Sequence, residues 1–441
     1  MIADPGVLES FRRDQAGPGL LEAGMPAAMV RPRTTAEVQA AVRAASRHGI
    51  PVVPRGAGSG LSGGANAIDG CLVVCTELMA DLIELDPGSL YARAQPGLIN
   101  AQLGEAAAAH GLRYAPDPAS FEFSTLGGNV ATNAGGLCCV KYGVTRDSLL
   151  GLEVVLADGS AVRVGRRTRK GVAGYDLTAL FCGSEGTLGI VTEATLRLMP
   201  EPPARATLAA SFESVAAAGA AIARISAAMT PAVLELMDRT TLTAVERMAP
   251  QGLDDDGIAT LVFACSDAPA AAALAEVDRM GGLCEAAGAT LVVTTDEAAE
   301  GRMLMNARRL AHPALERLGA TLLDDVCVPP AAIPALLEGV EGIGARAGLT
   351  IGTFGHAGDG NMHPTIVYDA ADPGEVERAK TAFAAIVELA LELGGTVSGE
   401  HGVGSLKLPF LDAELGAARP LHRAIKSALD PASVMNPGKA I

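Results

Sequence analysis

The chain has 441 residues, more than one hydrophobic core usually supports, so we expect at least two domains. Hydrophobic residues make up 49% of the sequence, aromatic residues only 3%, and tryptophan is absent, so aliphatic side chains must fill the interior. Acidic residues outnumber basic ones by 50 to 34, and the formal charge of −16 argues against nucleic acid or an anionic membrane as the main partner.

The cysteines and the first residues bear on redox state and location. None of the eight cysteines forms a Cys-x-x-Cys pair, which argues against a zinc ribbon or an iron–sulfur cluster and favours free, mostly buried thiols. The first residues lack the pattern of a signal peptide, and no apolar run reaches the roughly 18 residues that span a bilayer. We therefore expect a cytoplasmic protein without a transmembrane segment.

The first half of the chain predicts α+β structure with glycine loops. Residues 34–47 predict an amphipathic helix with a threonine N-cap, and strands are expected over 50–54 and 71–75. Alternation on both sides of an Asp-Gly pair predicts a hairpin over 152–164. The proline cluster at 198–203 favours a domain boundary.

In the second half, alanine-rich helices alternate with short strands, for which 260–264 and 290–294 are examples. Two strands over 350–356 and 362–368, joined by a glycine turn, precede a helix from about 373 to 393. The expected organisation is an N-terminal extension over 1–25, one domain over 26–203 and a second over 204–441.

Three glycine-rich segments, 54–65, 124–136 and 183–191, form the first candidate site. Residues 58–63 match the spacing of the dinucleotide fingerprint, but a strand rather than a helix is expected to follow, which weakens the match. A loop whose successive N–H groups bind a phosphate or pyrophosphate is the simpler interpretation, and a long turn is the bland alternative. Small residues in three such loops would let the backbone approach a large flat ligand closely.

Polar side chains in the same segments could bind the edge of such a ligand. Ser124, Thr125, Asn129 and Asn133 supply donors and acceptors. Glu185 is either a ligand contact or a solvated turn carboxylate.

Two glycine-lined polar strings near the C-terminus carry three of the seven histidines. Such strings bury little apolar area, so a chemical function explains their polar residues better than core packing does. His356 and His363 cannot share a helical face in the i, i+4 manner, but a hairpin that turns over 357–362 would bring both imidazoles to neighbouring strand ends, where they could share a metal ion. We interpret Asp359 as a turn residue rather than a ligand.

These segments together resemble the FAD domain of the vanillyl-alcohol-oxidase superfamily, and the C-terminal strings resemble its D-2-hydroxyacid dehydrogenase branch, which includes D-lactate dehydrogenases and the flavin subunit of glycolate oxidase. The similar motifs are residues 54–59, 126–136, 183–190, 325–329, 355–363, 399–404 and 435–439. The resemblance covers nearly the whole chain. It implies an α+β fold, in which a two-part PCMH-type FAD-binding domain precedes an α/β sandwich of ferredoxin-like type with an antiparallel sheet.

The resemblance also implies which residues contact FAD, with the tail over 430–441 returning to the FAD site. The expected contacts are Pro54, Arg55, Gly56, Ala57, Gly58, Ser59, Gly60, Pro116, Ser124, Thr125, Gly127, Gly128, Asn129, Ala131, Asn133, Gly135, Gly136, Gly143, Glu185, Gly186, Gly189, Ile190, Val191 and Asn436. No histidine lies in the first two glycine loops, which favours noncovalent binding.

By the same resemblance His356, His363 and Glu400 are the metal ligands and His401 is the general base. The N,N,O set suits Zn²⁺, and Mn²⁺ or Fe²⁺ are alternatives. A divalent ion would lower the pKa of the substrate hydroxyl, and a neutral imidazole would take the proton while hydride leaves for flavin N5.

The resemblance further bears on the substrate. Arg308 matches the arginine with which the family holds a carboxylate, whereas we expect Arg309 on a helix surface. Lys407 is either a functional lysine of the motif or a solvated one. Relatives that act on D-2-hydroxyglutarate carry a lysine and an asparagine where this chain has Leu323 and Thr365, which favours a monocarboxylate.

The sequence therefore predicts FAD-dependent oxidation of D-lactate or glycolate to the 2-oxo acid, with an electron acceptor other than NAD or O₂. A quinone, a cytochrome, an electron-transfer flavoprotein or an iron–sulfur subunit could be that acceptor, and docking to it would place the protein at a membrane periphery. The open alternatives are the flavin subunit of a multi-subunit glycolate oxidase, a D-2-hydroxyglutarate dehydrogenase, and a non-catalytic FAD-binding assembly module. A homodimer also stays open.

Overall fold

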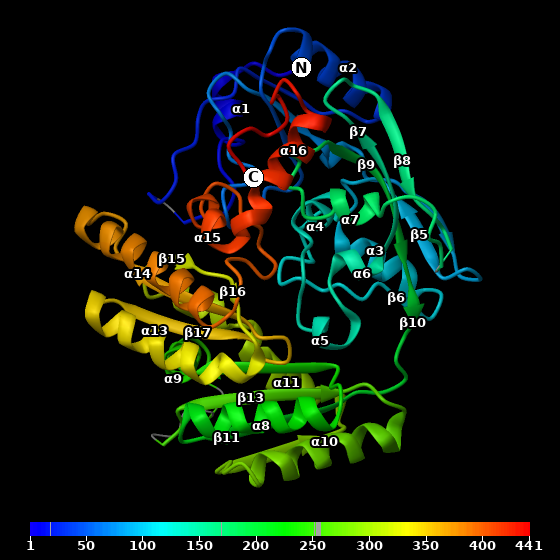
Figure 1. The fold of residues 1–441 in the computed structure, drawn as a ribbon. Coiled ribbons are helices and arrows are strands. Elements are labelled where there is room, and N and C mark those ends of the chain that lie inside the picture. The colour runs from blue at the N-terminus through cyan, green and yellow to red at the C-terminus, as the bar shows by residue number, and fades with distance from the viewer. Residues whose placement is uncertain (18, 169, 251, 253–256) are drawn as a thin grey trace.

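The computed structural model describes residues 1–17, 19–168, 170–250, 252 and 257–441. Two stacked regions of mixed helix and sheet make up the molecule, and the C-terminal tail, red in Figure 1, returns to the region built by the N-terminal half. Within the described residues, no helix is both long enough and apolar enough to span a bilayer.

A small parallel sheet begins the first region. Strands β1 (Ala28–Val30) and β2 (Val52–Arg55) both pair in parallel with β3 (Leu72–Cys75). Helix α2 (Thr35–Arg47) buries its predicted apolar stripe, and the Thr34 side chain accepts the Glu37 N–H as its N-cap. The predicted helix and the first two strands are thus confirmed.

A five-stranded antiparallel sheet forms the other part of this region, in the order β4-β5-β9-β7-β8. Its strands are β4 (Leu82–Asp86), β5 (Tyr91–Ala94), β7 (Leu149–Val155), β8 (Ala161–Gly165) and β9 (Ile190–Arg197). The predicted hairpin is confirmed by β7 and β8, which are joined through Gly159 at a φ of +77°. The expected two-part α+β architecture is confirmed by these two sheets.

Further short elements of this region precede β1, lie between strands of the larger sheet or follow β9, and some of them carry part of the candidate site. They are α1 (Pro5–Glu9), α3 (Asn100–Ala108), β6 (Leu112–Arg113), α4 (Leu126–Thr132), α5 (Cys139–Tyr142), α6 (Thr145–Ser148), α7 (Leu177–Phe181) and β10 (Met199–Pro200). The expectation of a loop throughout 124–136 is wrong, because Thr125 caps α4 there by accepting the Gly128 N–H.

The second region is an antiparallel sheet whose main path runs β14-β11-β13-β12-β17-β18-β15, with β16 also paired to β18. The strands are β11 (Ala206–Phe212), β12 (Val233–Asp238), β13 (Thr260–Ser266), β14 (Leu291–Thr295), β15 (Ala320–Leu323), β16 (Val326–Cys327), β17 (Thr350–His356) and β18 (Asn361–Tyr368). Every predicted strand of this half is present, and the expected antiparallel sheet is confirmed.

Helices cover both faces of this sheet. One core is shared with α8 (Val215–Ala228), α10 (Ala270–Glu285), α13 (Ile333–Ala347) and α14 (Pro373–Glu392), and the core on the other face is shared with α9 (Arg239–Met248), α11 (Ala298–Arg309) and α12 (Ala311–Glu316). Helix α14 confirms the helix predicted from about 373 to 393. The eight cysteines are free, as expected, and all but Cys139 and Cys327 are buried.

After α15 (Leu411–Leu415) and α16 (Arg419–Leu429), the tail joins the first region. Val52 donates its N–H to the Val434 carbonyl at 2.7 Å, and its own carbonyl accepts the Asn436 N–H at 2.8 Å. The Met435 side chain is fully buried in the core that α2 shares with both sheets of this region. The end of the chain is therefore part of the core of its beginning.

We expect Met435→Ala to destabilise the protein, because it removes a fully buried side chain from that core. Large-to-small core substitutions of this type cost about 2–5 kcal/mol. Equilibrium urea unfolding measures the loss. The control is Met303→Ala, since Met303 is 69% exposed, and equal stability of the two variants would contradict the packing of the tail.

Candidate active site

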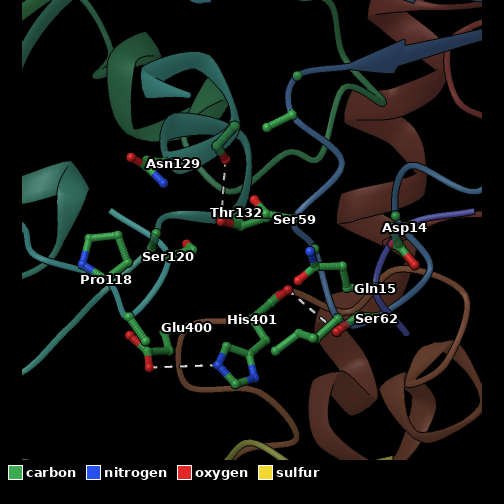
Figure 2. A pocket seen from close by; sticks show the side chains of 18 of the residues that line it. Asp14, Gln15, Ser59, Ser62, Pro118, Ser120, Asn129, Thr132, Glu400 and His401 are labelled. Carbon is green, nitrogen blue, oxygen red and sulfur yellow. Dashed lines mark hydrogen bonds and ion pairs between the residues drawn. The ribbon is translucent and has the colours of Figure 1, made fainter. Parts of the chain in front are cut away.

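A cavity of about 1190 Å³ is lined by residues of both regions. This volume exceeds the roughly 300–1,000 Å³ of sites for drug-sized ligands. The glycine segments of the first region form much of its wall, and the histidine strings of the second region close one end. Figure 2 shows this arrangement, with Ser59 and Thr132 on one side and Glu400 with His401 on the other. The cavity is large enough for an extended cofactor and a small second ligand.

The first glycine loop lies on the cavity wall with backbone N–H groups that are unpaired among the described residues. In the described part of the chain, no acceptor takes a hydrogen bond from the N–H groups of residues 57–62. Gly58 has a φ of +74°, and a Cβ there would lie 2.0 Å from the Arg55 guanidinium. As expected, the loop leads into β3 without an intervening helix. Free successive N–H groups of this kind suit a phosphate or pyrophosphate.

The second glycine segment also approaches its neighbours closely. A Cβ at Gly127 would lie 2.5 Å from the Pro96 Cβ, so only glycine leaves the wall undisturbed at this position. With the free N–H groups of the first loop, this close-fitting backbone suits the pyrophosphate and the flat ring system of FAD.

Most of the expected FAD contacts lie on the cavity wall. These are Pro54, Arg55, Gly56, Ala57, Gly58, Ser59, Gly60, Thr125, Gly127, Gly128, Asn129, Ala131, Gly136, Glu185, Gly186, Gly189, Ile190 and Val191. The other expected contacts, Pro116, Ser124, Asn133, Gly135, Gly143 and Asn436, are not among the residues that line the cavity.

Several of these remaining residues support the wall from behind. The Ser124 hydroxyl accepts a hydrogen bond from the Asn129 amide at 3.2 Å. The side-chain oxygen of Asn133, Oδ1, accepts the Arg146 N–H at 2.9 Å. The Asn436 amide donates to the carbonyl oxygens of Gly64, at 3.0 Å, and Glu185, at 2.7 Å.

The predicted histidine hairpin is present. In the β17–β18 register, Phe354 lies opposite His363 and His356 opposite Asn361, so both histidines stand on one face of the sheet. Their ring centroids are 5.1 Å apart. Asp359 lies in the turn between the strands, as expected.

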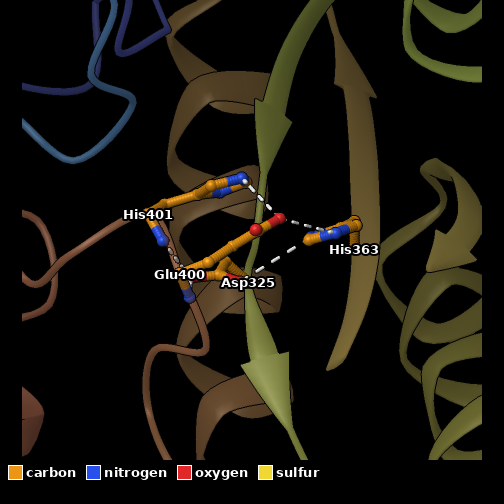
Figure 3. A group of neighbouring side chains, drawn as sticks. All are labelled: Asp325, His363, Glu400 and His401. Atoms are coloured by element: carbon orange, nitrogen blue, oxygen red, sulfur yellow. Dashed lines mark hydrogen bonds and ion pairs between the residues drawn. The ribbon is translucent and has the colours of Figure 1, made fainter. Parts of the chain in front are cut away.

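The second histidine string brings Glu400 and His401 to this pair, and Figure 3 shows both residues beside His363. Glu400 Oε1 lies 3.2 Å from His356 Nε2, 3.5 Å from His363 Nε2 and 3.7 Å from His401 Nε2. The rings of His363 and His401 are stacked with centroids 5.1 Å apart. The structure thus gathers all four residues for which the sequence predicted metal or base roles.

Asp325 belongs to the same cluster, although nothing in its sequence context beyond its motif predicts a role for it. One ligand atom each from Asp325, His363, Glu400 and His401 lie within 4.8 Å of one another. However, Asp325 Oδ2 already accepts the N–H groups of Glu400, at 3.0 Å, and His401, at 2.8 Å, and Oδ1 accepts the Asn361 amide at 2.8 Å. We therefore interpret Asp325 as the residue that organises the loop, not as a ligand.

The charge of Asp325 is strongly stabilised. Burial alone would raise the pKa of this carboxyl group, but the neighbouring basic side chains, chiefly His401 and Lys407, hold that pKa well below its usual range. The group is therefore a permanent anion, suited to fixing N–H groups.

Sequence reasoning missed Glu235, which is fully buried. One of its oxygens lies 2.7 Å from His356 Nδ1 and the other 2.7 Å from Arg308 Nε. Arg308 is also buried, with its guanidinium 4.7 Å from the centre of the Phe354 ring. The sequence signal for Glu235 is a glutamate in the middle of the apolar run 233–237.

The residues of the cluster fit a divalent ion. Glu235 engages His356 Nδ1 and leaves Nε2 facing Glu400, an arrangement typical of metal-bound histidines. Nδ1 of His363 and Nδ1 of His401 are buried without a hydrogen-bond partner among the described residues. Burial and the neighbouring histidines hold the pKa of His363 well below its usual value, which favours the neutral form that a metal ligand needs.

Two alternatives left open by the sequence are decided by burial. Lys407 is not solvated, because it is 1% exposed and its Nζ lies 3.1 Å from Asp324 Oδ1. Glu185 is not a solvated turn residue either, since it is 8% exposed and burial raises its pKa to about 7. Arg309 is exposed, as expected, at the rim of the cavity.

Known sequence families match both regions. The family described as "FAD binding domain" matches residues 26–165, and "FAD linked oxidases, C-terminal domain" matches residues 201–440. The chain is 44% identical to glycolate oxidase subunit GlcD of Bacillus subtilis (strain 168), over 94% of this chain and 89% of that protein. It is 34% identical to a D-lactate dehydrogenase of Archaeoglobus fulgidus, over 94% of this chain and 91% of that protein.

More distant solved structures share the fold. A 4-ethylphenol oxidase from Gulosibacter chungangensis superposes with a TM-score of 0.81 at 22% identity, covering 100% of this chain and 93% of that one. A p-cresol methylhydroxylase gives the same TM-score and coverage at 20% identity. At these identities the likeness concerns the fold alone.

We expect Lys407→Met to be strongly destabilising, because it leaves the fully buried Asp324 without its cation. Breaking a buried ion pair in this way costs about 3–5 kcal/mol. Urea unfolding of the variant measures the effect, and Lys380→Met, at a 42% exposed side chain, is the control. Adding Asp324→Asn should restore part of the loss, and a harmless Lys407→Met would contradict the buried pair.

Proposed function

We propose that this chain, which belongs to the FAD-linked oxidase family, oxidises a small D-2-hydroxy monocarboxylic acid, D-lactate or glycolate, to the 2-oxo acid. One observation carries the proposal: a buried arginine, a histidine cluster and a nearby carboxylate meet at one end of the cavity whose other walls suit FAD. The names of the relatives, glycolate oxidase subunit and D-lactate dehydrogenase, favour the same class of acid.

FAD, when bound, supplies the acceptor for the hydride that leaves the substrate Cα. In our proposal the free N–H groups of residues 57–62 hold its pyrophosphate, and the small residues of the other two glycine segments lie against its rings.

Arg308 is our candidate for holding the substrate carboxylate. Its Nε lies 2.7 Å from Glu235 Oε2 in an ion pair that lacks hydrogen-bond geometry, and its terminal nitrogens donate to no acceptor within the described ranges. A guanidinium held in this way can offer those nitrogens to a carboxylate. Leu323, also on the wall, offers nothing to a second carboxylate, which favours a monocarboxylate.

We assign His401 as the general base. Its Nδ1 is buried without a partner, so Nε2 is the nitrogen to which we assign the substrate's hydroxyl proton. Its stacking on His363 and its backbone hydrogen bond to Asp325 restrict the orientation of the ring. A fixed orientation supports the role of a base, whose nitrogen must point at the substrate hydroxyl group.

His356, His363 and Glu400 would hold the divalent ion, Zn²⁺ or alternatively Mn²⁺ or Fe²⁺. When bound, such an ion lowers the pKa of a hydroxyl group that it contacts. The carboxylate of Glu235 behind His356 would orient that ligand.

The electrons must leave the reduced flavin for an external acceptor. We propose a redox partner other than NAD or O₂, namely a quinone, a cytochrome, an electron-transfer flavoprotein or an iron–sulfur protein. The name of the Bacillus relative, a glycolate oxidase subunit, favours a partner protein in a complex. Copurification of an affinity-tagged chain from its native cells distinguishes a stable complex from an independent enzyme.

The substrate is tested by anaerobic stopped-flow mixing of the FAD-loaded protein with D-lactate, glycolate, L-lactate and D-2-hydroxyglutarate. We expect D-lactate or glycolate to bleach the flavin band fastest. His401→Ala should retain FAD but reduce it about 10²–10⁴-fold more slowly, because the base is missing.

The control variant is His110→Ala, since His110 is an exposed histidine outside the cavity wall, and it should reduce FAD at the normal rate. Unimpaired reduction in His401→Ala would refute the base. No bleaching by any of the four acids would refute the oxidase and favour a non-catalytic FAD-binding module, and fastest bleaching by D-2-hydroxyglutarate would overturn the monocarboxylate.

Metal analysis tests the ligands. Protein purified without chelator should contain about one divalent ion per chain, and His363→Ala should lose it, because that change removes one of three protein ligands. Inductively coupled plasma mass spectrometry gives the ratio, and dialysis against a chelator should slow flavin reduction until the ion is returned. Metal-free protein of full activity would contradict the assignment.

A further inference from the structure

We propose that Glu185 acts as a positioning residue that, together with Ser62, holds the loop bearing Glu400 and His401 against the FAD-binding region. The sequence suggested Glu185 as an FAD contact, but its side chain points to another task. The inference rests on the proposed role of His401, and it adds the device that fixes the position of this base relative to the flavin.

The carboxylate of Glu185 binds two successive peptide groups of the loop. Oε1 accepts the Val403 N–H at 2.7 Å, and Oε2 accepts the Gly404 N–H at 2.9 Å. Both bonds join residues more than two hundred positions apart in the sequence. Because both oxygens are engaged by the loop, the carboxylate is better placed to hold that loop than to bind a cofactor.

Ser62 holds the peptide groups on either side. Its hydroxyl group lies 2.9 Å from the Gly402 carbonyl and 3.3 Å from the His401 carbonyl, to which Figure 2 draws the contact. Its own carbonyl accepts the N–H groups of Ser405 at 3.0 Å and Leu406 at 3.1 Å. The segment from residue 401 to 406 is thus bonded along its length to the FAD-binding region.

The loop approaches so closely that two of its positions require glycine. A Cβ on Gly402 would lie 2.9 Å from the Glu185 carboxyl carbon, and one on Gly404 would lie 1.9 Å from the Ser62 carbonyl oxygen. Both glycines also have positive φ angles, +83° and +52°. The backbone of the loop is therefore shaped to fit these two partners.

Glu185 is itself held rigidly. Its N–H donates to the Ala131 carbonyl at 2.9 Å, its carbonyl accepts the Asn436 amide at 2.7 Å, and its φ of +50° is rare for a residue with a side chain. Because its backbone is fixed, the Glu185 side chain can fix the position of the loop that it binds.

The two ends of the catalytic loop are consequently anchored in different regions. Asp325 of the second region binds the N–H groups of Glu400 and His401, while Glu185 of the first region binds those of Val403 and Gly404. Both anchors set the position of His401. Loss of Glu185 should therefore move this base relative to the flavin, while both the base and the bound FAD remain present.

The test is Glu185→Gln in the FAD-loaded, full-length protein. The amide keeps the size of the side chain but replaces one acceptor oxygen by an NH₂ group that faces a backbone N–H. If the energy of the lost hydrogen bond to a charged group acts on the position of the base, the rate of flavin reduction should fall about tenfold or more. We expect that slowing together with a shifted pH profile of flavin reduction and a nearly unchanged dissociation constant for the acid.

Glu193→Gln is the matched control, because Glu193 is a buried glutamate of the same region whose partners are Arg93 and Arg163. It should leave the rate and pH profile of flavin reduction unchanged. Ser62→Ala is the second test variant, since it loosens the same loop from its other partner, and it should slow reduction in the same way.

An FAD-replete Glu185→Gln variant with the normal rate and pH profile would overturn the proposal. So would loss of FAD from Glu185→Gln combined with normal reduction by Ser62→Ala, because Glu185 would then serve the cofactor. Hydrogen–deuterium exchange tests the anchor independently of the proposed oxidation reaction. Faster exchange of residues 400–406 in Glu185→Gln supports the anchor even if no acid reduces the flavin of the unaltered protein, an outcome that would refute the proposed function alone.

Discussion

The candidate active site depends on a buried negative charge at Asp325, placed where the chain passes from β15 to β16. This buried carboxylate must be satisfied by protein donors, which include the Asn361 amide, the Ser398 hydroxyl group and the peptide groups of Glu400 and His401. Meeting that requirement brings a segment from the end of the chain onto the histidine hairpin. The desolvation of one side chain thereby holds Glu400 and His401 beside this hairpin, while Glu235 holds Arg308 and His356.

Around this charge, carboxylates alternate with basic side chains. Glu235 lies between Arg308 and His356, Glu400 lies among three histidines, and the neighbouring Asp324 is paired with Lys407. Buried carboxylates without a basic partner would repel one another. Each carboxylate therefore stays close to its basic partner, which restricts the position of both side chains. The cluster is correspondingly stiff before any ligand enters, which suits a site that must align a carboxylate, a hydroxyl group and a hydride acceptor.

Local pattern was sufficient for most of the individual strands and helices that we predicted, because strand alternation and glycine turns are encoded within short windows, whereas the two-part fold was predicted from the resemblance to a known family. The histidine hairpin is an example: the spacing of His356 and His363 together with the turn residues predicted it, and the β17–β18 register confirms it. Glu235 could not be found in this way, since its partners are Arg308 and His356, far along the chain. Glu185 and Lys407 were ambiguous for the same reason, because burial depends on the packing of distant segments and not on neighbours in sequence.

The return of the C-terminal tail to the first region has a consequence for biosynthesis. Met435 fills a core whose other members, such as Val38 and Val52, are made at the beginning of translation. The nascent N-terminal region must therefore wait, with that part of its apolar surface uncovered, until nearly four hundred further residues have been polymerised. Such a topology delays completion of this core until residues 434–436 have been synthesised.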